Sequence, residues 1–330
     1  MKASLVQSTG ESSTRSGPCA AGAGPSLQSI LTQVRVTGVT FLHISNVSSP
    51  GSIIFDSTLT QLTFNKHEVS ASMSNTGQTV RLRVSDSEVP VYLRGGPLVY
   101  SYTFTEIIFH WADRGSQDGS EHSINHHSFP AEVQIYGYNS DLYPNMSVAR
   151  EEVRGLVAVS LMVQQEEAGT RLEQDHSRSH SGLGAIIARL PNIKYSGQQT
   201  NIPRLSLAHI VPSTGEFITY EGSTTYPGCW ETVTWIMMNK PVYISRQEME
   251  LFHQLSQGAD SSEGEQPGLG NTLRPRQNLN RRIVRTNIDL KYQGDCSVDT
   301  SSERQFQANT WLHRVAQDRL AGARGEFILK

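Results

Sequence analysis

The chain has 330 residues, a formal net charge of -3 and 37% hydrophobic residues. This length allows one large domain or two small ones, and either could bury a core. The lack of a basic excess argues against nucleic acid as the main partner. The sequence contains no run of about 18 apolar residues, which a membrane span would need. No apolar h-region of a signal peptide follows the initial methionine.

Residues 1–52 are predicted to be a divergent, partly disordered N-terminal segment. Up to about residue 28 the chain is rich in Ser, Gly, Thr and Ala and has few large apolar side chains. Such a stretch cannot offset its loss of conformational entropy by burial. Apolar residues return from Ile30 to Val47, but without a clear period.

From residue 53 the pattern becomes a succession of strand signals. Residues 79–84 alternate polar and apolar, which is typical of a half-buried strand. Residues 89–93 form a second β-rich run, which the turn Gly95-Gly96-Pro97 closes. Further short runs, separated by Gly, Ser, Asn or Pro, cover 106–111, 131–138, 156–163 and 232–238. The sequence therefore predicts a mainly β fold.

Helix signals are few. Ser245-Arg246-Gln247-Glu248 is a capping box that predicts a short helix carrying Met249, Phe252 and Leu255. We expect one mainly β domain over 53–292 and a polar C-terminal tail over 293–330. In that tail Ala308, Trp311, Leu312 and Val315 fall at helical spacing, which predicts a surface helix or a docking motif.

An ordered series of motifs over about 240 residues resembles the alpha-carbonic anhydrases. The motifs are Gly95-Gly96-Pro97-Leu98, Phe109-His110-Trp111, Gly119-Ser120-Glu121-His122, Ala131-Glu132-Val133, Tyr220-Glu221-Gly222-Ser223-Thr224-Thr225 and Glu231-Thr232-Val233-Thr234-Trp235. The segment Met237–Ile244, Arg285-Thr286-Asn287 and the ending Gln293-Gly294-Asp295-Cys296 are similar to carbonic anhydrase-related proteins of types ten and eleven. This resemblance implies a single domain with a large, twisted, mostly antiparallel sheet and a few short helices. The resemblance also predicts that the domain is N-terminally incomplete, because 1–52 lacks the family's Trp-Gly start and Cys-containing Gln-Ser-Pro segment.

The same resemblance places three zinc-ligand positions at Ile108, His110 and Gln134. The family's zinc needs three neutral imidazoles and lowers the pKa of its water to about 7. Side chains two apart on one strand share a face, so two ligand positions come from one strand and the third from its neighbour. Ile108 has no lone pair, and Gln134 offers only a poor amide ligand. We therefore predict that the zinc is lost and that no cofactor replaces it.

Other positions of the resemblance also depart from catalysis. Gln78 stands where active enzymes often carry a proton-shuttling histidine, and glutamine does not titrate near neutral pH. Glu121 and Thr225 match the pair that orients a zinc-bound hydroxide and are predicted to remain as a structural pair. Tyr226 replaces a small residue and would narrow the pocket, and Thr224 replaces an apolar wall residue.

Isolated histidines have plainer interpretations than metal binding. We expect His110 to be a hydrogen-bonded core histidine. The histidines at 126–127, 176 and 180 lie in polar, loop-like stretches, so we expect them at the solvated surface.

We predict a catalytically inactive protein, secreted or at the cell surface, that acts as a protein-binding module. The type ten and eleven resemblance implies a neurexin as partner, with Cys296 able to form an intermolecular disulfide or remaining an idle thiol. It also implies glycosylation at Asn145. Cys229 matches one half of a family disulfide, for which Cys19 is an alternative partner. The three cysteines do not themselves decide the compartment.

Two other hypotheses remain. The chain could be a weak zinc-dependent carbonic anhydrase that holds zinc through His110 and a non-homologous second ligand. Alternatively, it is a splice or gene-model fragment that folds poorly and has no function of its own.

Overall fold

The computed structural model describes residues 53–288, with gaps at 66, 86–88, 124–127, 166–181, 212–213, 260–266, 271–272 and 274–281. The predicted N-terminal segment 1–52 and the tail 293–330 therefore lie outside the described residues, as do Cys19, Cys296 and the helix predicted around 308–315. The same holds for the histidines at 126–127, 176 and 180. Within the described part of the chain, no helix is long and apolar enough to cross a membrane.

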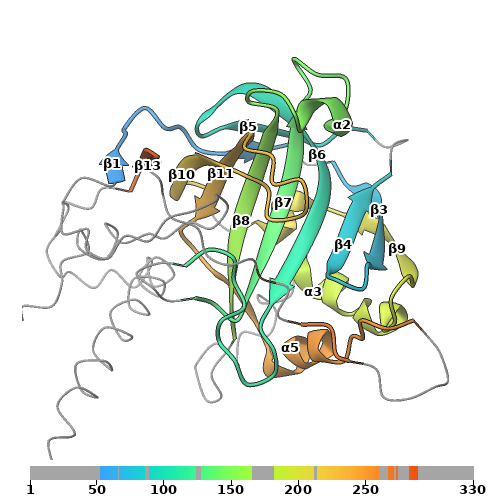
Figure 1. The fold of residues 1–330 in the computed structure, drawn as a ribbon. Helices are drawn as coiled ribbons and strands as arrows, with labels where there is room; N and C mark the ends of the chain where they lie inside the picture. The colour runs from blue at the N-terminus through green and yellow to red at the C-terminus, as the bar shows by residue number, and fades with distance from the viewer. Residues whose placement is uncertain are drawn as a thin grey trace, which may run out of the picture.

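One thirteen-stranded sheet organises the described residues (Figure 1). Its main path runs β1-β13-β10-β11-β8-β7-β6-β4-β3-β9, while β5 pairs with β2 and β6, and β12 pairs with β8. The strands are β1 Ile53–Phe55, β2 Thr63–Phe64, β3 Val69–Asn75, β4 Val80–Val84, β5 Tyr92–Gly95, β6 Leu98–Trp111, β7 Ala131–Asn139, β8 Leu156–Gln165, β9 Gln199–Leu205, β10 Phe217–Gly222, β11 Val233–Met238, β12 Val242–Ile244 and β13 Val284–Thr286.

Most strand pairs are antiparallel, as the sequence predicted. Among the described strands, the parallel pairs are β1 with β13, β8 with β11 and β8 with β12. The predicted mainly β fold, with a large and mostly antiparallel sheet, is therefore confirmed.

Strand β6 begins earlier than its sequence signal at residue 106. Gly95 and Gly96 have φ of +80° and +58°, a conformation that glycine adopts without steric penalty. The resulting tight turn reverses the chain, and Gly95 of β5 pairs with Leu98 at the start of β6. Pairing with β5 therefore extends β6 well upstream of the apolar run that marked it in the sequence.

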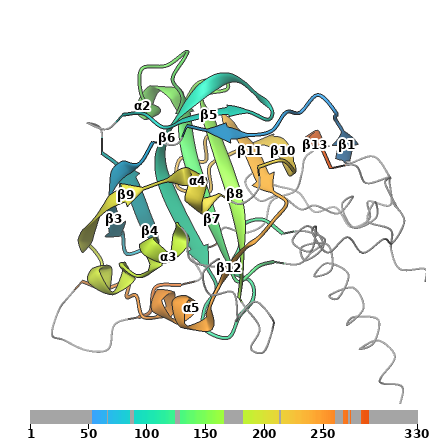
Figure 2. The ribbon, with the colours of Figure 1, turned by 180° about the vertical axis from the view of Figure 1, so that it is seen from behind.

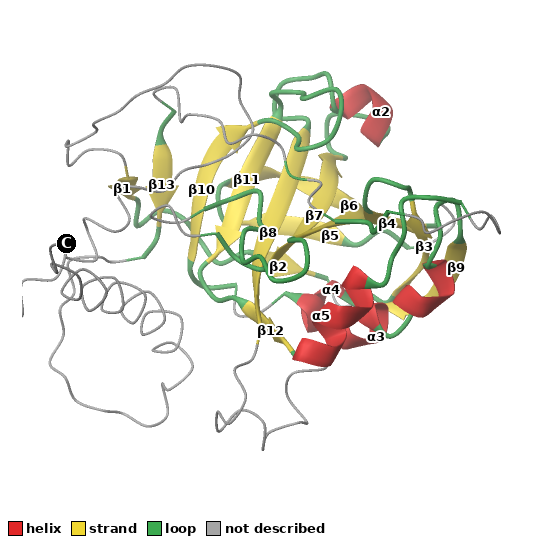
Figure 3. Cartoon of the chain, turned by 60° about the horizontal axis from the view of Figure 1, so that its bottom comes forward, coloured by secondary structure: helices red, strands yellow, loops and turns green. Residues whose placement is uncertain are grey.

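Short helices cover one face of the sheet (Figures 2 and 3). They are α3 Leu183–Ile187, the 3-10 helix η2 Leu190–Ile193, α4 Leu207–Ile210 and α5 Arg246–His253, while α2 Met146–Ala149 follows β7. Apolar residues of α3, α4 and α5 join the larger core cluster together with Phe109 and Trp111 of β6. Because strand residues alternate in direction, Ile108 and His110 point to the opposite face.

Helix α5 begins with the predicted capping box. Ser245 is its N-cap and accepts a hydrogen bond from the backbone of Glu248 at 3.2 Å, while the Glu248 carboxylate accepts one from the Ser245 backbone at 2.8 Å. Met249 and Phe252 are buried, and the Phe252 ring lies 5.1 Å from that of Trp111. The cap therefore starts the helix where its apolar face can close the core beneath β6.

Candidate functional site

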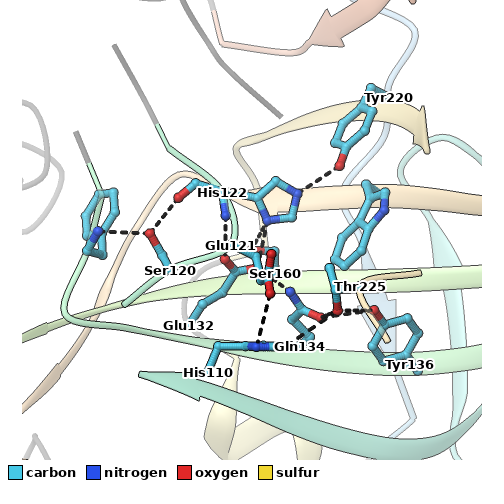
Figure 4. A network of polar contacts seen from close by, with 12 residues as sticks. His110, Ser120, Glu121, His122, Glu132, Gln134, Tyr136, Ser160, Tyr220 and Thr225 are labelled. Carbon is cyan, nitrogen blue, oxygen red and sulfur yellow. Dashed lines mark hydrogen bonds and ion pairs between the residues drawn. The ribbon is translucent and has the colours of Figure 1, made fainter. Parts of the chain in front are cut away.

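Strands β6 and β7 are neighbours and bring the predicted ligand positions together. The register pairs Ile108 with Gln134, His110 with Glu132 and Glu106 with Tyr136. Each of these positions is at most 7% exposed. The sheet face that bears His110 and Gln134 therefore carries buried polar groups, whose contacts Figure 4 shows.

A loop next to β7 delivers Glu121 and His122 to this face. The loop starts at Gly119, where a Cβ atom would lie 2.0 Å from the Pro130 carbonyl oxygen, so only glycine fits against that backbone. The Gly119 N–H donates to the Phe129 carbonyl at 2.8 Å, and the Phe129 N–H donates to the Ser120 hydroxyl at 2.9 Å. Contacts of Gly119 and Ser120 thus fix the backbone just before Glu121 and His122.

Glu132 is the centre of the buried network. Its carboxylate accepts hydrogen bonds from the His122 backbone at 2.9 Å and from His122 Nδ1 at 2.7 Å. It also accepts from Gln134 Nε2 at 2.9 Å and from the Ser160 hydroxyl at 2.8 Å. Burial by itself would raise the pKa of Glu132, but the interactions with His122 outweigh it and lower this pKa to about 2. Glu132 is therefore a buried carboxylate that stays ionised.

His122 extends the network to a further strand. Because a carboxylate can only accept, Nδ1 of His122 donates to Glu132, and Nε2 faces the Tyr220 hydroxyl at 2.8 Å. The His122 ring also packs edge-on against Trp235, with centroids 4.7 Å apart. Residues from β7, β8, β10 and β11 are thereby tied to one loop.

The side-chain amide of Gln134 is engaged at both ends. Its nitrogen donates to Glu132, while its oxygen accepts from the Thr225 hydroxyl at 2.7 Å and from the Tyr136 hydroxyl at 3.0 Å. The Tyr136 and Thr225 oxygens are 3.3 Å apart. The amide thus bridges the Glu132 carboxylate and two hydroxyl groups.

His110 lies beside both Glu121 and Thr225, the two residues that the sequence predicted to remain as a structural pair. Its Nδ1 is 3.4 Å from Glu121 Oε1, and its Nε2 is 3.5 Å from Thr225 Oγ1. Burial lowers the pKa of His110 to about 4, against the opposing effect of the Glu132 carboxylate. The imidazole is therefore neutral near pH 7. It is buried between Glu121 and Thr225.

The donor set does not fit a zinc ion. Ile108 contributes only hydrocarbon, and both polar ends of Gln134 already hold protein partners. His110 is the single imidazole among the three positions, whereas family zinc sites need three protein ligands. No group of three or more His, Cys, Asp or Glu side chains in the described part of the chain could hold a metal ion.

Four other predicted positions are exposed or only half-buried. Gln78 is exposed in the turn between β3 and β4. Asn145 is exposed as the N-cap of α2 and accepts a hydrogen bond from the Val148 backbone at 3.0 Å. Cys229 is exposed, and among the described residues it has no disulfide partner. Tyr226 is half-buried, and its ring lies 5.4 Å from that of Tyr136.

The sequence analysis missed that Tyr136, Ser160 and Tyr220 belong to the same network as Glu132. One signal was present, because Glu132, Gln134 and Tyr136 place polar groups at every second position of a strand that is otherwise apolar. Ser160 and Tyr220 come from other strands, so no local pattern could reveal them.

Comparison with known proteins agrees with this architecture. A model of the eukaryotic-type carbonic anhydrase family matches residues 48–288. Putative carbonic anhydrase-like protein 2 of Caenorhabditis elegans is 34% identical over 270 residues, which cover 79% of this chain and 77% of that protein. The carbonic anhydrase-related protein of Homo sapiens is 33% identical over 220 residues, covering 64% of this chain and 71% of the relative. The chain belongs to the eukaryotic-type carbonic anhydrase family.

Proposed function

We propose that this protein is a catalytically inactive member of its family that acts as a protein-binding module. The observation that carries the proposal is the amide of Gln134, which stands at a ligand position and is hydrogen-bonded at both ends. Two further observations support it, namely the apolar Ile108 opposite Gln134 and the relatives named carbonic anhydrase-related or carbonic anhydrase-like.

The network also supports a structural role for the former site. Hydration of CO2 at neutral pH needs a hydroxide, which the family obtains by lowering the pKa of zinc-bound water. His110 alone cannot supply the three ligands that a zinc ion needs, and it cannot itself generate a hydroxide in place of the metal. The surrounding hydrogen bonds instead tie β7, β8 and β10 to the loop at 119–123, and this rigid core would hold the outer surface in shape for a partner.

Measuring CO2 hydration by the purified chain, with excess zinc added, tests the inactive assignment. We expect the rate to equal that of a buffer blank containing the same zinc. A matched variant, Ile108→His with Gln134→His, should bind about one zinc per chain under the same conditions. Zinc-dependent turnover by the unaltered chain would refute the proposal.

The partner proposal rests on the resemblance to types ten and eleven. We propose an extracellular partner of the neurexin type, with Cys296 forming an intermolecular disulfide. A pull-down with neurexin ectodomains, followed by non-reducing electrophoresis, should give a covalent complex that Cys296→Ser abolishes. Cys229→Ser is the matched control and should leave the complex intact. Absence of binding would remove the neurexin proposal, and a complex unaffected by Cys296→Ser would remove the disulfide.

One observation favours a residual carbonic anhydrase as the second candidate. The His110 imidazole still lies 3.4 Å from Glu121 Oε1 and 3.5 Å from Thr225 Oγ1. A weak enzyme of this kind would lose its zinc-dependent rate on His110→Gln, so the same hydration assay separates the two candidates.

A further inference from the structure

Tyr136 is a large side chain at the centre of the former site. It lies two residues beyond Gln134 on β7, on the same face of the sheet, and it is fully buried. Its ring packs edge-on against Tyr226 and Trp235, with centroids 5.4 and 5.8 Å away. The phenol thus extends from the strand that bears Gln134 toward the segment that bears Thr225 and Tyr226.

The hydroxyl of Tyr136 contacts the side chain at one ligand position, Gln134, and the hydroxyl of Thr225. It donates to Gln134 Oε1 at 3.0 Å and lies 3.3 Å from Thr225 Oγ1. Thr225 matches the family residue that orients the zinc-bound hydroxide, so a phenol oxygen stands beside the atom that would do the orienting. Burial raises the pKa of Tyr136 well above its usual value, so this oxygen stays a neutral hydroxyl.

Replacing the lost imidazoles would leave Tyr136 in place. Its backbone is fixed on both sides, by pairing with Glu106 of β6 and with Ala158 of β8. A histidine at 134 would remove the amide oxygen, but the Tyr136 hydroxyl would keep Thr225 as a partner. The ring would also keep its contacts with Tyr226 and Trp235.

We propose that Tyr136 is a second and independent obstruction of this site, which occupies the space beside Thr225 that a hydroxide and its substrate would need. This inference rests on the proposed function and deepens it. Restoring the ligands would then restore metal binding without restoring turnover, and shortening Tyr136 would be required for the latter.

The test compares three variants of the full chain. The background is Ile108→His with Gln134→His, to which either Tyr136→Val or Tyr138→Val is added. Tyr138 is the matched control, because it lies on the same face of β7, one strand repeat further on, and packs against the same apolar cluster. Each variant is assayed for zinc per chain, for CO2 hydration and, after loading with Co2+, for the change in its visible absorption when azide is added.

We expect all three variants to bind about one metal ion per chain. The background and the Tyr138→Val variant should show little hydration and no azide response, because the position beside Thr225 is filled. Adding Tyr136→Val should create the azide response and raise hydration by about tenfold or more. Tyr136→Leu, which fills more of the vacated volume, serves as a second variant if valine destabilises the fold.

The outcomes separate the two proposals. An azide response and brisk hydration in the background variant would overturn the obstruction by Tyr136 and leave the loss of the zinc ligands intact. A metal-loaded Tyr136→Val variant without azide response or added turnover would also overturn it. Metal binding that appears only after Tyr136→Val would overturn the proposed form of the obstruction, in which the two histidines alone restore the metal and Tyr136 blocks only the hydroxide and its substrate. Failure of every variant to bind metal would overturn the assigned ligand positions and with them the obstruction by Tyr136, whereas the proposed function is overturned only by zinc-dependent turnover of the unaltered chain.

Discussion

Replacing Glu132 by glutamine tests whether this carboxylate organises the core. Four donors converge on it, from the His122 backbone, His122 Nδ1, Gln134 Nε2 and the Ser160 hydroxyl. A glutamine has the same size, but its NH2 group cannot accept a hydrogen bond. Whichever way the amide turns, at least one buried donor would therefore face another donor.

The expected loss of stability is large because the carboxylate is fully buried. Hydrogen bonds to a charged group contribute about 1.5–3 kcal/mol each, and an unsatisfied buried donor costs about 1–3 kcal/mol. Since Glu132 and Gln134 are both fully buried, water cannot replace the lost acceptor. We expect Glu132→Gln to lower the free energy of unfolding by about 3–5 kcal/mol, because one buried donor loses its acceptor and the others lose a charged one.

Urea unfolding at pH 7 measures this directly, with the m-value compared between variants. Glu250→Gln is the matched control, because Glu250 pairs with Arg114 at the surface at 2.6 Å, and exposed pairs contribute about 0–1 kcal/mol. A Glu132→Gln variant within about 1 kcal/mol of the unaltered chain would refute the reasoning.

Three other predictions follow from single contacts. Unfolded His110 binds a proton near pH 6.5 and the folded ring only near 4, so stability should fall by about 3 kcal/mol as the pH drops through this window; His110→Gln should remove that component from pH-dependent unfolding curves. Ser245→Ala should cost about 1 kcal/mol in thermal or urea unfolding by removing the cap of α5, whereas an unchanged stability would contradict the cap's role. In a chain secreted from eukaryotic cells, Ser147→Ala should abolish an Asn145 glycan, seen as the loss of the glycan mass, while keeping the Asn145 cap of α2; a mass that changes only by the Ser→Ala substitution itself would contradict glycosylation there.

The strands around the site were predictable because their signals are local. The runs at 106–111, 131–138 and 156–163 all lie inside observed strands, namely β6, β7 and β8. Strand period also placed the side chains at 108 and 110 on one face. The adjacency of β6 and β7, however, came from the resemblance, since no local pattern records which strands pair.

Elements with weak local signals were not predicted. In β3 every second residue is a small polar serine, and β9 contains Pro203, which is unfavourable in a strand except at an edge. Helix α3 has five residues and no side-chain cap bond. Helices this short depend on tertiary packing, in this case on Leu183 and Ile186 in the core cluster.

The unsuitable chemistry at the predicted ligand positions is visible in the sequence, whereas the hydrogen-bond network around Gln134 is not. Ile108 and Gln134 are unsuitable ligands by their chemistry alone. The network around Gln134, by contrast, depends on the register that brings Ser160 of β8 to Glu132 and on the segment that delivers Thr225. These contacts join residues far apart in the chain, so only the fold reveals that Thr225 donates to Gln134.

Zinc content tests the central claim of this account most directly. The full chain would be purified from zinc-supplemented culture without chelators and analysed by elemental mass spectrometry, next to its Ile108→His with Gln134→His variant. The account predicts far less than one zinc per chain in the unaltered protein and about one in the variant. One tightly held zinc per unaltered chain, lost on His110→Gln, would contradict it.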